Sequence, residues 1–238
     1  MRRTFDRVPS KPDPVRLTTY NLAPLITHKT PRGYTWRCGY WLDQQQEGAC
    51  VPHAYVHEAL AAPVVVDFTK VRMPTWATRA AKVEPRLRKS VAQAFTFDLY
   101  DYLRTIDEIP GENYEGTTMA AGARGMKQLG FYPSYRWSKD ADDLSIWVSY
   151  RGPAVLGCEW FTGMMDTDTD GFIRPSGIVE GLHGVLLNGF SVRHRAHRIH
   201  QSWGLDWGVG GEAWLPHEDL KMLLANGGEA MIPMSRRT

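Results

Sequence analysis

The stretch DQQQEGACVPHAYVHEAL, residues 43–60, places a cysteine and two histidines on one predicted helix. Positions four, seven and ten residues after Cys50 share its helical face. Pro52 is tolerated only in a first helical turn, so the helix should begin at or just before Cys50. The N-terminus of a helix favours a thiolate, whereas His53 and His57 have the four-residue spacing that can hold a metal. A nucleophile, a metal site and an ordinary core helix are all open interpretations.

A thiol nucleophile also needs a histidine and oxyanion donors, which other elements must supply. Residues 91–107 and 117–130 have helical patterns, the first with one apolar stripe and the second with Thr117 or Thr118 as N-cap and Gly130 at its end. Short segments rich in β-formers follow, at 153–161, 184–192, 197–203 and 210–216. Helices in the first half and antiparallel strands in the second predict an α+β fold with a cleft between two lobes.

The less regular segments are expected to connect these elements. Residues 1–35 should form an extended arm on the domain, and residues 62–68 a short strand or a link. Residues 75–90 are helical in composition but interrupted by Pro85.

Length and composition narrow the class of protein. A chain of 238 residues suits one large domain or one domain of two lobes, and 43% apolar residues allow a sizeable core. The net charge of +2 gives no argument for nucleic acid or an anionic membrane. We expect no membrane span and no signal peptide. Three cysteines are a poor disulfide framework and favour a reducing compartment, so the predicted location is the cytoplasm or, for a phage product, the virion.

Three segments in order carry a family resemblance. Gln44 stands six residues before Cys50, with Gly48 two before it; GLHGVLLNGF follows with His183; and IHQSWGLDWGVGGEAWLP then supplies the Ser-Trp-Gly and Trp-Gly pairs that begin at Ser202. Between them lie NYEGTTMAAGARGMKQLGFYP and RGPAVLGCEWF. Over roughly residues 35–220 the chain resembles the papain family of cysteine peptidases, closest to bacterial or phage-type members without propeptide or disulfides.

The resemblance implies catalytic roles for four residues. Cys50 would be the nucleophile, and His183 would pair with it as imidazolium and later protonate the leaving amine. Gln44 would donate its side-chain amide to the oxyanion, beside the backbone N–H of Cys50. Gln201 would orient His183. The resemblance implies no metal and no cofactor.

The resemblance also implies which residues meet the substrate, a protein or peptide. Trp203 would cover the bond between His183 and Gln201. The expected substrate-binding residues are Gly48, Gly116, Thr117, Met119, Leu182 and Trp203. Because Leu182 and Met119 are apolar, the resemblance suggests an apolar side chain beside the cleaved residue.

The departures from the family pattern leave alternatives open. The orienting residue is normally asparagine, and Gln201 is one methylene longer, so the imidazole would be held less firmly. Glu47 stands where secreted members have a disulfide cysteine. The second hypothesis is therefore a weak or inactive relative that binds peptide or protein partners in the same cleft, and the third is acyl transfer to an amine. The predicted division is an arm at 1–35 and a peptidase domain at 36–238, with lobes at about 45–135 and 136–238; the arm is the segment that would restrain the enzyme.

Plainer interpretations are preferred for the remaining motifs. No glutamate separates the two helical histidines as in zinc proteases, which favours core histidines. DTDTDGFIRPSG, from Asp166, begins like a calcium loop, but Gly177 replaces the acid at its twelfth position, which favours an acidic turn. RHRAHRIH, residues 193–200, fits a solvated hairpin, and Cys38 and Cys158 fit plain thiols. No nucleic-acid or membrane partner is expected, and the oligomeric state stays open.

Overall fold

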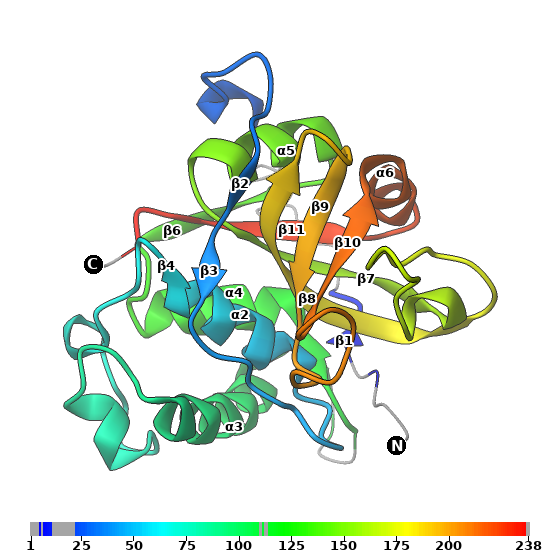
Figure 1. Cartoon of the computed structure of the whole chain (residues 1–238). Coiled ribbons are helices and arrows are strands. Elements are labelled where there is room, and N and C mark those ends of the chain that lie inside the picture. The colour runs from blue at the N-terminus through cyan, green and yellow to red at the C-terminus, as the bar shows by residue number, and fades with distance from the viewer. Residues whose placement is uncertain (1–4, 6, 11–21, 110, 112–113, 237–238) are drawn as a thin grey trace.

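The computed structural model describes residues 5, 7–10, 22–109, 111 and 114–236. Figure 1 shows three helices, α2, α3 and α4, on one side and a twisted antiparallel sheet with α5 and α6 on the other. The predicted α+β architecture with a helical and a sheet lobe is confirmed. The exact lobe boundaries and the arm at 1–35 stay predictions, since residues 1–4, 6 and 11–21 of that arm lie outside the described residues.

Helix α2 (Cys50–Leu60) is the central helix, and all of its residues are buried. It begins at Cys50, as predicted, with Pro52 in its first turn and Ala49 as N-cap. It packs against α3 (Lys89–Ile106) on one side and against strand β8 (Val179–Ser191) on the other. The first residue of the helix therefore lies where the two lobes meet.

The two other predicted helices are also confirmed. In α3 the stripe of Phe95, Leu99 and Leu103 is fully buried. Helix α4 (Met119–Gln128) begins at the cap Thr118, whose hydroxyl accepts a hydrogen bond from Ala121 N at 3.0 Å. These two helices and α2 pack together to form the helical lobe.

The large sheet has the strand order β10-β9-β8-β7-β11-β6, with β2 pairing beside β8. All of its pairings are antiparallel. The bounds are β2 (Tyr34–Thr35), β6 (Ser134–Ser138), β7 (Ala154–Phe161), β9 (Ala196–His200), β10 (Glu212–Pro216) and β11 (Glu229–Met234). Strands β7 and β8 form its centre, so a residue in the middle of β8 is buried.

Two helices of the sheet lobe were not predicted. Helix α5 (Ala141–Tyr150) begins at Asp140, whose carboxylate accepts from the N–H groups of Asp142 and Asp143. Its sequence is rich in Ile, Trp, Val and Tyr, which favour strands, and the Asp cap decides against that preference. Helix α6 (His217–Ala225) follows β10 directly.

The connecting segments are largely irregular. Between Pro74 and α3 there is the 3-10 turn η3 (Arg79–Lys82), because Pro85 interrupts the helical composition. Strand β4 (Ala61–Ala62) pairs with β3 (Arg37–Cys38), and residues 63–67 continue as a link. Other short turns are η1 (Ala23–Leu25), η2 (Phe68–Lys70) and η4 (Thr162–Met164).

A short N-terminal strand lies far from its sequence neighbours. Strand β1 (Arg7–Val8) pairs in parallel with β5 (Thr117–Thr118), just before α4. In Figure 1 it lies at the lower right, near the start of α2 and the end of β8 that faces it. Over the described residues, no helix is long and apolar enough to cross a membrane.

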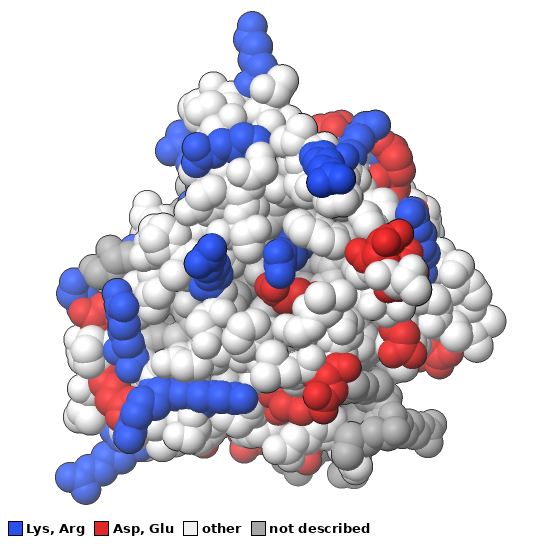
Figure 2. Space-filling model, viewed as in Figure 1, with Lys and Arg blue, Asp and Glu red and all other residues white. Residues whose placement is uncertain are grey.

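Charged side chains of both signs are interspersed on the face seen in Figure 2. The basic segment 193–200 forms the turn between β8 and β9 and the whole of β9, which confirms the hairpin. Arg195 pairs with Glu218 at 2.8 Å, and Arg198 pairs with Glu212. These arginines are thus partly neutralised by neighbouring carboxylates.

Candidate active site

The Cys50 end of helix α2 lies directly against strand β8. A Cβ placed on Gly184 would stand 3.4 Å from Val51 N and 3.5 Å from the carbonyl carbon of Cys50, which is ordinary van der Waals contact. His183 directly precedes Gly184 in β8, so the same packing places the His183 backbone beside the Cys50 end of the helix. The first-turn N–H groups of a helix favour a negatively charged group there.

Gln201 reaches His183 despite its extra methylene. His183 Nε2 lies 2.9 Å from Gln201 Oε1. The amide oxygen can only accept, so Nε2 carries the hydrogen and donates it. In the neutral ring Nδ1 is then the basic nitrogen, on the edge of the imidazole away from Gln201. Gln201 directly follows β9, the neighbour of β8, and this pairing sets the distance.

Two tryptophans enclose the His183–Gln201 pair. The ring of Trp203 lies 4.8 Å from the imidazole and that of Trp160 lies 4.9 Å from it, measured between centroids. Both indoles are buried. Excluding water strengthens the hydrogen bond, because the local dielectric is low. Trp160 was not singled out from the sequence, since it appears there as one apolar residue of a strand.

The Gln44 side chain is held beside the segment that contains Gln201. Its Nε2 donates to Glu47 O at 2.9 Å, its Oε1 accepts from Ser202 Oγ at 2.6 Å, and its backbone N donates to Ser202 O at 2.8 Å. The amide nitrogen carries a second hydrogen. Gln45 is exposed and has φ +57°, which fits the loop role predicted for it.

The predicted substrate-binding residues form two groups, and the N-terminal segment touches both. Gly116 and Thr117 precede α4, and Thr117 is in register with Arg7 of β1. Leu182 is half-buried beside His183, and its neighbour Gly181 contacts Phe5. Gly116 has φ +89°, a conformation that favours glycine, and donates its N–H to Tyr100 Oη at 2.8 Å. Met119 and Gly48 are buried.

The two helical histidines are core residues. His53 Nδ1 lies 2.7 Å from Ala49 O, and His57 Nε2 accepts from Leu42 N at 3.2 Å. Burial lowers the pKa of His53 to about 4 and that of His57 well below its ordinary value. In the described part of the chain, no three His, Cys, Asp or Glu side chains gather as a metal site would require.

The other two thiols lie in apolar surroundings. Burial raises the pKa of Cys158 to about 12, and burial also raises that of Cys38. Cys38, Cys50 and Cys158 are all buried, and none of the three is in a disulfide. The acidic motif forms a turn, as predicted: Asp168 accepts from the N–H groups of Asp170 and Phe172 at 3.0 and 2.8 Å.

Besides Trp160, sequence reasoning missed three residues near the site: Phe5, Arg7 and Glu229. The ring of Phe5 lies edge-on to His183, 5.8 Å between centroids, and Arg7 pairs with Glu229 in a buried position. Glu229 is an acidic residue at the start of the apolar strand β11. An acidic residue in such a strand indicates a buried charge with a partner, and this was the one signal in the sequence. Phe5 and Arg7 lie in a segment without periodicity, and no local pattern indicates where such a segment docks.

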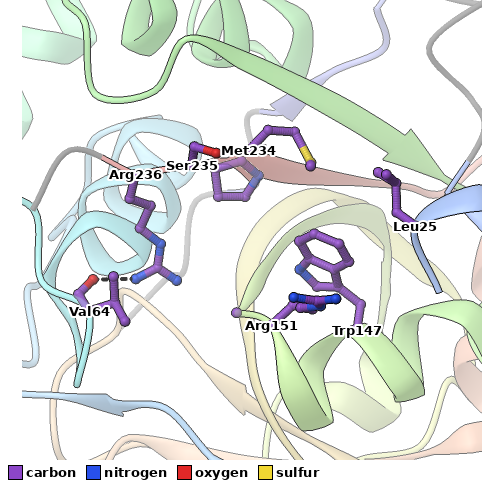
Figure 3. A pocket seen from close by; sticks show the side chains of 9 residues that line it. Leu25, Val64, Trp147, Arg151, Met234, Ser235 and Arg236 are labelled. Carbon is purple, nitrogen blue, oxygen red and sulfur yellow. Dashed lines mark hydrogen bonds between the residues drawn. The ribbon is translucent and has the colours of Figure 1, made fainter. Parts of the chain in front are cut away.

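A hollow of about 420 Å³ lies away from these residues, between α5, the link after β4 and the end of β11 (Figure 3). Trp147, Arg151 and Arg236 line it, and Arg236 Nη1 donates to Val64 O at 2.7 Å. Its lining contains no cysteine, histidine or carboxylate. It is not part of the Cys50 site.

Comparison with solved structures identifies the fold. Xylellain, a cysteine protease from Xylella fastidiosa, matches with a TM-score of 0.56 at 17% identity, over 98% of this chain and 96% of that one. The bromelain protease from Ananas comosus, in complex with the E64 inhibitor, gives 0.51 at 15% identity, over 86% and 99%. Digestive procathepsin L 3 from Tenebrio molitor gives 0.51 at 14%, over 96% and 74%. No family model and no curated protein matches the sequence. The chain thus has the papain-like, two-lobe fold.

Proposed function

We propose that this protein is a cysteine peptidase with Cys50 as its nucleophile. The Cys50 sulfur attacks a peptide carbonyl carbon, and its proton passes to His183 Nδ1. The resulting oxyanion is stabilised by the backbone N–H of Cys50 and the side-chain amide of Gln44. His183 then gives the proton to the leaving amine as the C–N bond breaks. Water, losing a proton to His183, attacks the thioester, releases the carboxylic acid and restores the thiol.

One observation carries the proposal: the hydrogen bond between His183 Nε2 and Gln201 Oε1 at 2.9 Å, in a strand packed on the Cys50 end of α2. It fixes the tautomer that makes Nδ1 the base. The similarity in fold to proteins described as cysteine proteases supports the same function. The expected substrate is a protein or peptide, and the expected location remains the cytoplasm.

The bond to Gln201 also bears on the alternative of an inactive binding protein. The main argument for that alternative was that Gln201 would hold the His183 imidazole less firmly than asparagine does. A distance of 2.9 Å is an ordinary hydrogen-bond length, and the pair is shielded by Trp203. The peptidase is therefore the function that the geometry supports better.

Labelling with a thiol-directed epoxide at neutral pH tests the proposal. We expect stoichiometric modification of Cys50, mapped by mass spectrometry, and strong slowing in His183→Ala. Cys38 and Cys158 are internal controls, because both lie in strands rather than at a helix N-terminus and burial raises the pKa of each thiol. Equal labelling of all three thiols, or none at Cys50 even after the folded protein is shown to be intact, would contradict the proposal. An added amine in a peptide assay separates hydrolysis from acyl transfer by product mass.

A further inference from the structure

The hollow shown in Figure 3, whose lining includes Trp147, Gly152 and Arg236, is here called the Arg236 pocket. It adjoins the C-terminal end of α2, because Arg236 donates to the carbonyl of Ala61, the C-cap of that helix. Cys50 is the first of the 11 residues of α2, and a helix of this length spans about 16 Å. The pocket is therefore separate from the Cys50 site, and a ligand in it is independent of the proposed peptidase function.

Arg236 is held in place by contacts on one side of its guanidinium. Its Nε lies 2.6 Å from Glu58 Oε1, and its Nη1 donates to Ala61 O at 3.1 Å and to Val64 O at 2.7 Å. The Arg236 side chain is only 6% exposed. These contacts use Nε and Nη1, so Nη2 is the part of the guanidinium that stays available to a ligand.

Trp147 faces Arg236 across the pocket (Figure 3). Trp147 is 6% exposed, and its indole Nε1 is an N–H donor. A Cβ placed on Gly152 would stand 3.1 Å from Arg236 Nη2 and 3.9 Å from Trp147 Nε1. The two donors thus flank one point above Gly152, where a single acceptor group can bond to both.

Both donors lack a partner of their own. Among the residues that the structure describes, neither Arg236 Nη2 nor Trp147 Nε1 has a hydrogen-bond acceptor, and both atoms are shielded from solvent. A buried donor that has lost its bonds to water and gained none in return is destabilising, and more so when it is charged. A ligand oxygen between the two side chains restores both bonds, and Nη2, at the tip of a flexible side chain, can turn toward it.

The charges around the pocket fit one negative charge. Arg236 and Arg151 both line it, and the Glu58 carboxylate beside Arg236 balances one of these two cations. One positive charge remains. It suits a carboxylate better than a phosphate group, which carries nearly two negative charges at neutral pH.

The other walls of the pocket are apolar. They include Leu25, Val64 and Met234, and Val64 is 38% exposed, so this surface is open to a ligand. The volume of about 420 Å³ lies within the roughly 300–1,000 Å³ of small-molecule sites, which combine apolar walls with a few convergent polar groups. The pocket therefore suits a ligand with a hydrocarbon body and one acceptor group.

We propose that the Arg236 pocket binds an aliphatic carboxylate. The carboxylate accepts hydrogen bonds from Arg236 Nη2 and Trp147 Nε1 above Gly152, and the hydrocarbon part packs against Leu25 and Val64. A free aliphatic acid and the C-terminus of a peptide with an aliphatic last residue offer the same group.

Isothermal titration calorimetry of the full chain with 4-methylpentanoate tests the proposal, with 4-methylpentanamide as the uncharged match. We expect saturable one-to-one binding of the acid, at least about tenfold tighter than that of the amide, because hydrogen bonds to a charged acceptor are the stronger ones. N-acetyl-leucine presents the same carboxylate on a peptide end. Tighter binding of N-acetyl-leucine than of 4-methylpentanoate would assign peptide C-termini as the source, and the reverse order would assign the free acid.

Gly152→Ala should weaken binding of the acid at least tenfold, because its methyl group fills the point between the two donors. Gly39→Ala is the matched control, since no atom lies within 4 Å of the added Cβ there, and neither glycine has a positive φ. Trp147→Phe keeps the ring but removes the N–H, and should weaken binding several-fold; it also serves if Gly152→Ala fails to fold.

Three results would overturn the inference: no saturable binding of either acid, equal affinities for acid and amide, or unchanged affinity in folded Gly152→Ala and Trp147→Phe. Tighter binding of inorganic phosphate than of 4-methylpentanoate would reject the carboxylate assignment. Because these measurements involve no turnover, none of these results bears on Cys50 as a nucleophile.

Discussion

His183 and His217 are both buried, and each is bonded to polar side chains in an arrangement used by hydrolases. The Cys50 site comprises Cys50, His183 and Gln201. The Ser145 cluster comprises Ser145, His197, His217 and Asp142. In the latter, Ser145 Oγ lies 3.1 Å from His217 Nδ1, and His217 Nε2 lies 2.9 Å from Asp142 Oδ1. By distances alone, the Ser145 cluster is the closer match to a serine triad.

The difference lies in where the Cys50 thiol and the Ser145 hydroxyl stand in their helices. Ser145 is inside α5, and its hydroxyl donates to Ala141 O at 2.8 Å, so its proton is directed away from both histidines. The N–H groups of Asp142, Asp143 and Leu144, in the turn before it, already donate to the side chain and carbonyl of Asp140. Cys50 is the first residue of α2, where first-turn N–H groups have no partner within the helix. Distances between polar side chains therefore identify a site only together with a helix end or a similar set of donors.

Replacing each histidine should give the largest contrast. In His183→Ala we expect peptide hydrolysis to fall at least about a thousandfold, because the general acid–base is lost. His217→Ala should keep kcat/KM within about threefold per folded molecule. Steady-state assays with a peptide substrate measure both. A comparable loss in a well-folded His217→Ala protein would mean that the Ser145 cluster takes part in catalysis.

Gln44→Ala should have the second-largest effect on activity. The side-chain amide of Gln44 is the proposed oxyanion donor, and the Ser145 cluster as defined above contains no such amide. We expect kcat to fall by roughly a hundredfold, the usual effect of removing one oxyanion donor. Ser202→Ala is the matched control, since it removes the 2.6 Å bond to Gln44 Oε1 but keeps the amide N–H. An equal loss in both variants would show that the segment matters through its packing alone.

Gln201→Ala should reduce kcat by about ten- to a hundredfold, through the orientation of His183. The pH profile of kcat should shift as well, because the imidazolium loses its acceptor. Gln201→Asn tests the reach of the side chain: it shortens the amide by one methylene within the same strand geometry. Wild-type activity and an unchanged pH profile in Gln201→Ala would reject the positioning role.

The Ser145 cluster should instead affect how the free energy of unfolding depends on pH. Burial lowers the pKa of His197 from its ordinary 6.5 to about 3. Between these values the unfolded chain binds a proton that the folded chain does not, so the free energy of unfolding falls as pH drops below about 6.5. The slope from this group is on the order of 1 kcal/mol per pH unit. Urea unfolding at several pH values should show a smaller slope in His197→Gln. His194→Gln is the control, because His194 is exposed on the β8–β9 turn.

Much of the fold followed from local patterns. The start of α2 was set by Pro52 and the loop before Cys50, and the stripe of α3 by its helical period. The alternation and turn residues of the second half indicated its central strands. Helix α5 escaped prediction because its apolar residues favour strands, and the cap at Asp140 outweighs that preference. Helices α2 and α3 were predictable because their local signals agree, whereas in α5 the residue preferences and the cap point to different structures.

The identity of the chemical groups was also in the sequence. The spacing of Gln44, Gly48 and Cys50, followed by His183 and the segment from Gln201, indicated a thiol site without any structure. What the tertiary structure decided was which of these side chains contact one another. Whether Gln201 touches His183 depends on the pairing of β8 with β9, and the encounter of Arg7 with Glu229 joins residues 222 positions apart. Such contacts come from the packing of whole elements, which no local pattern encodes.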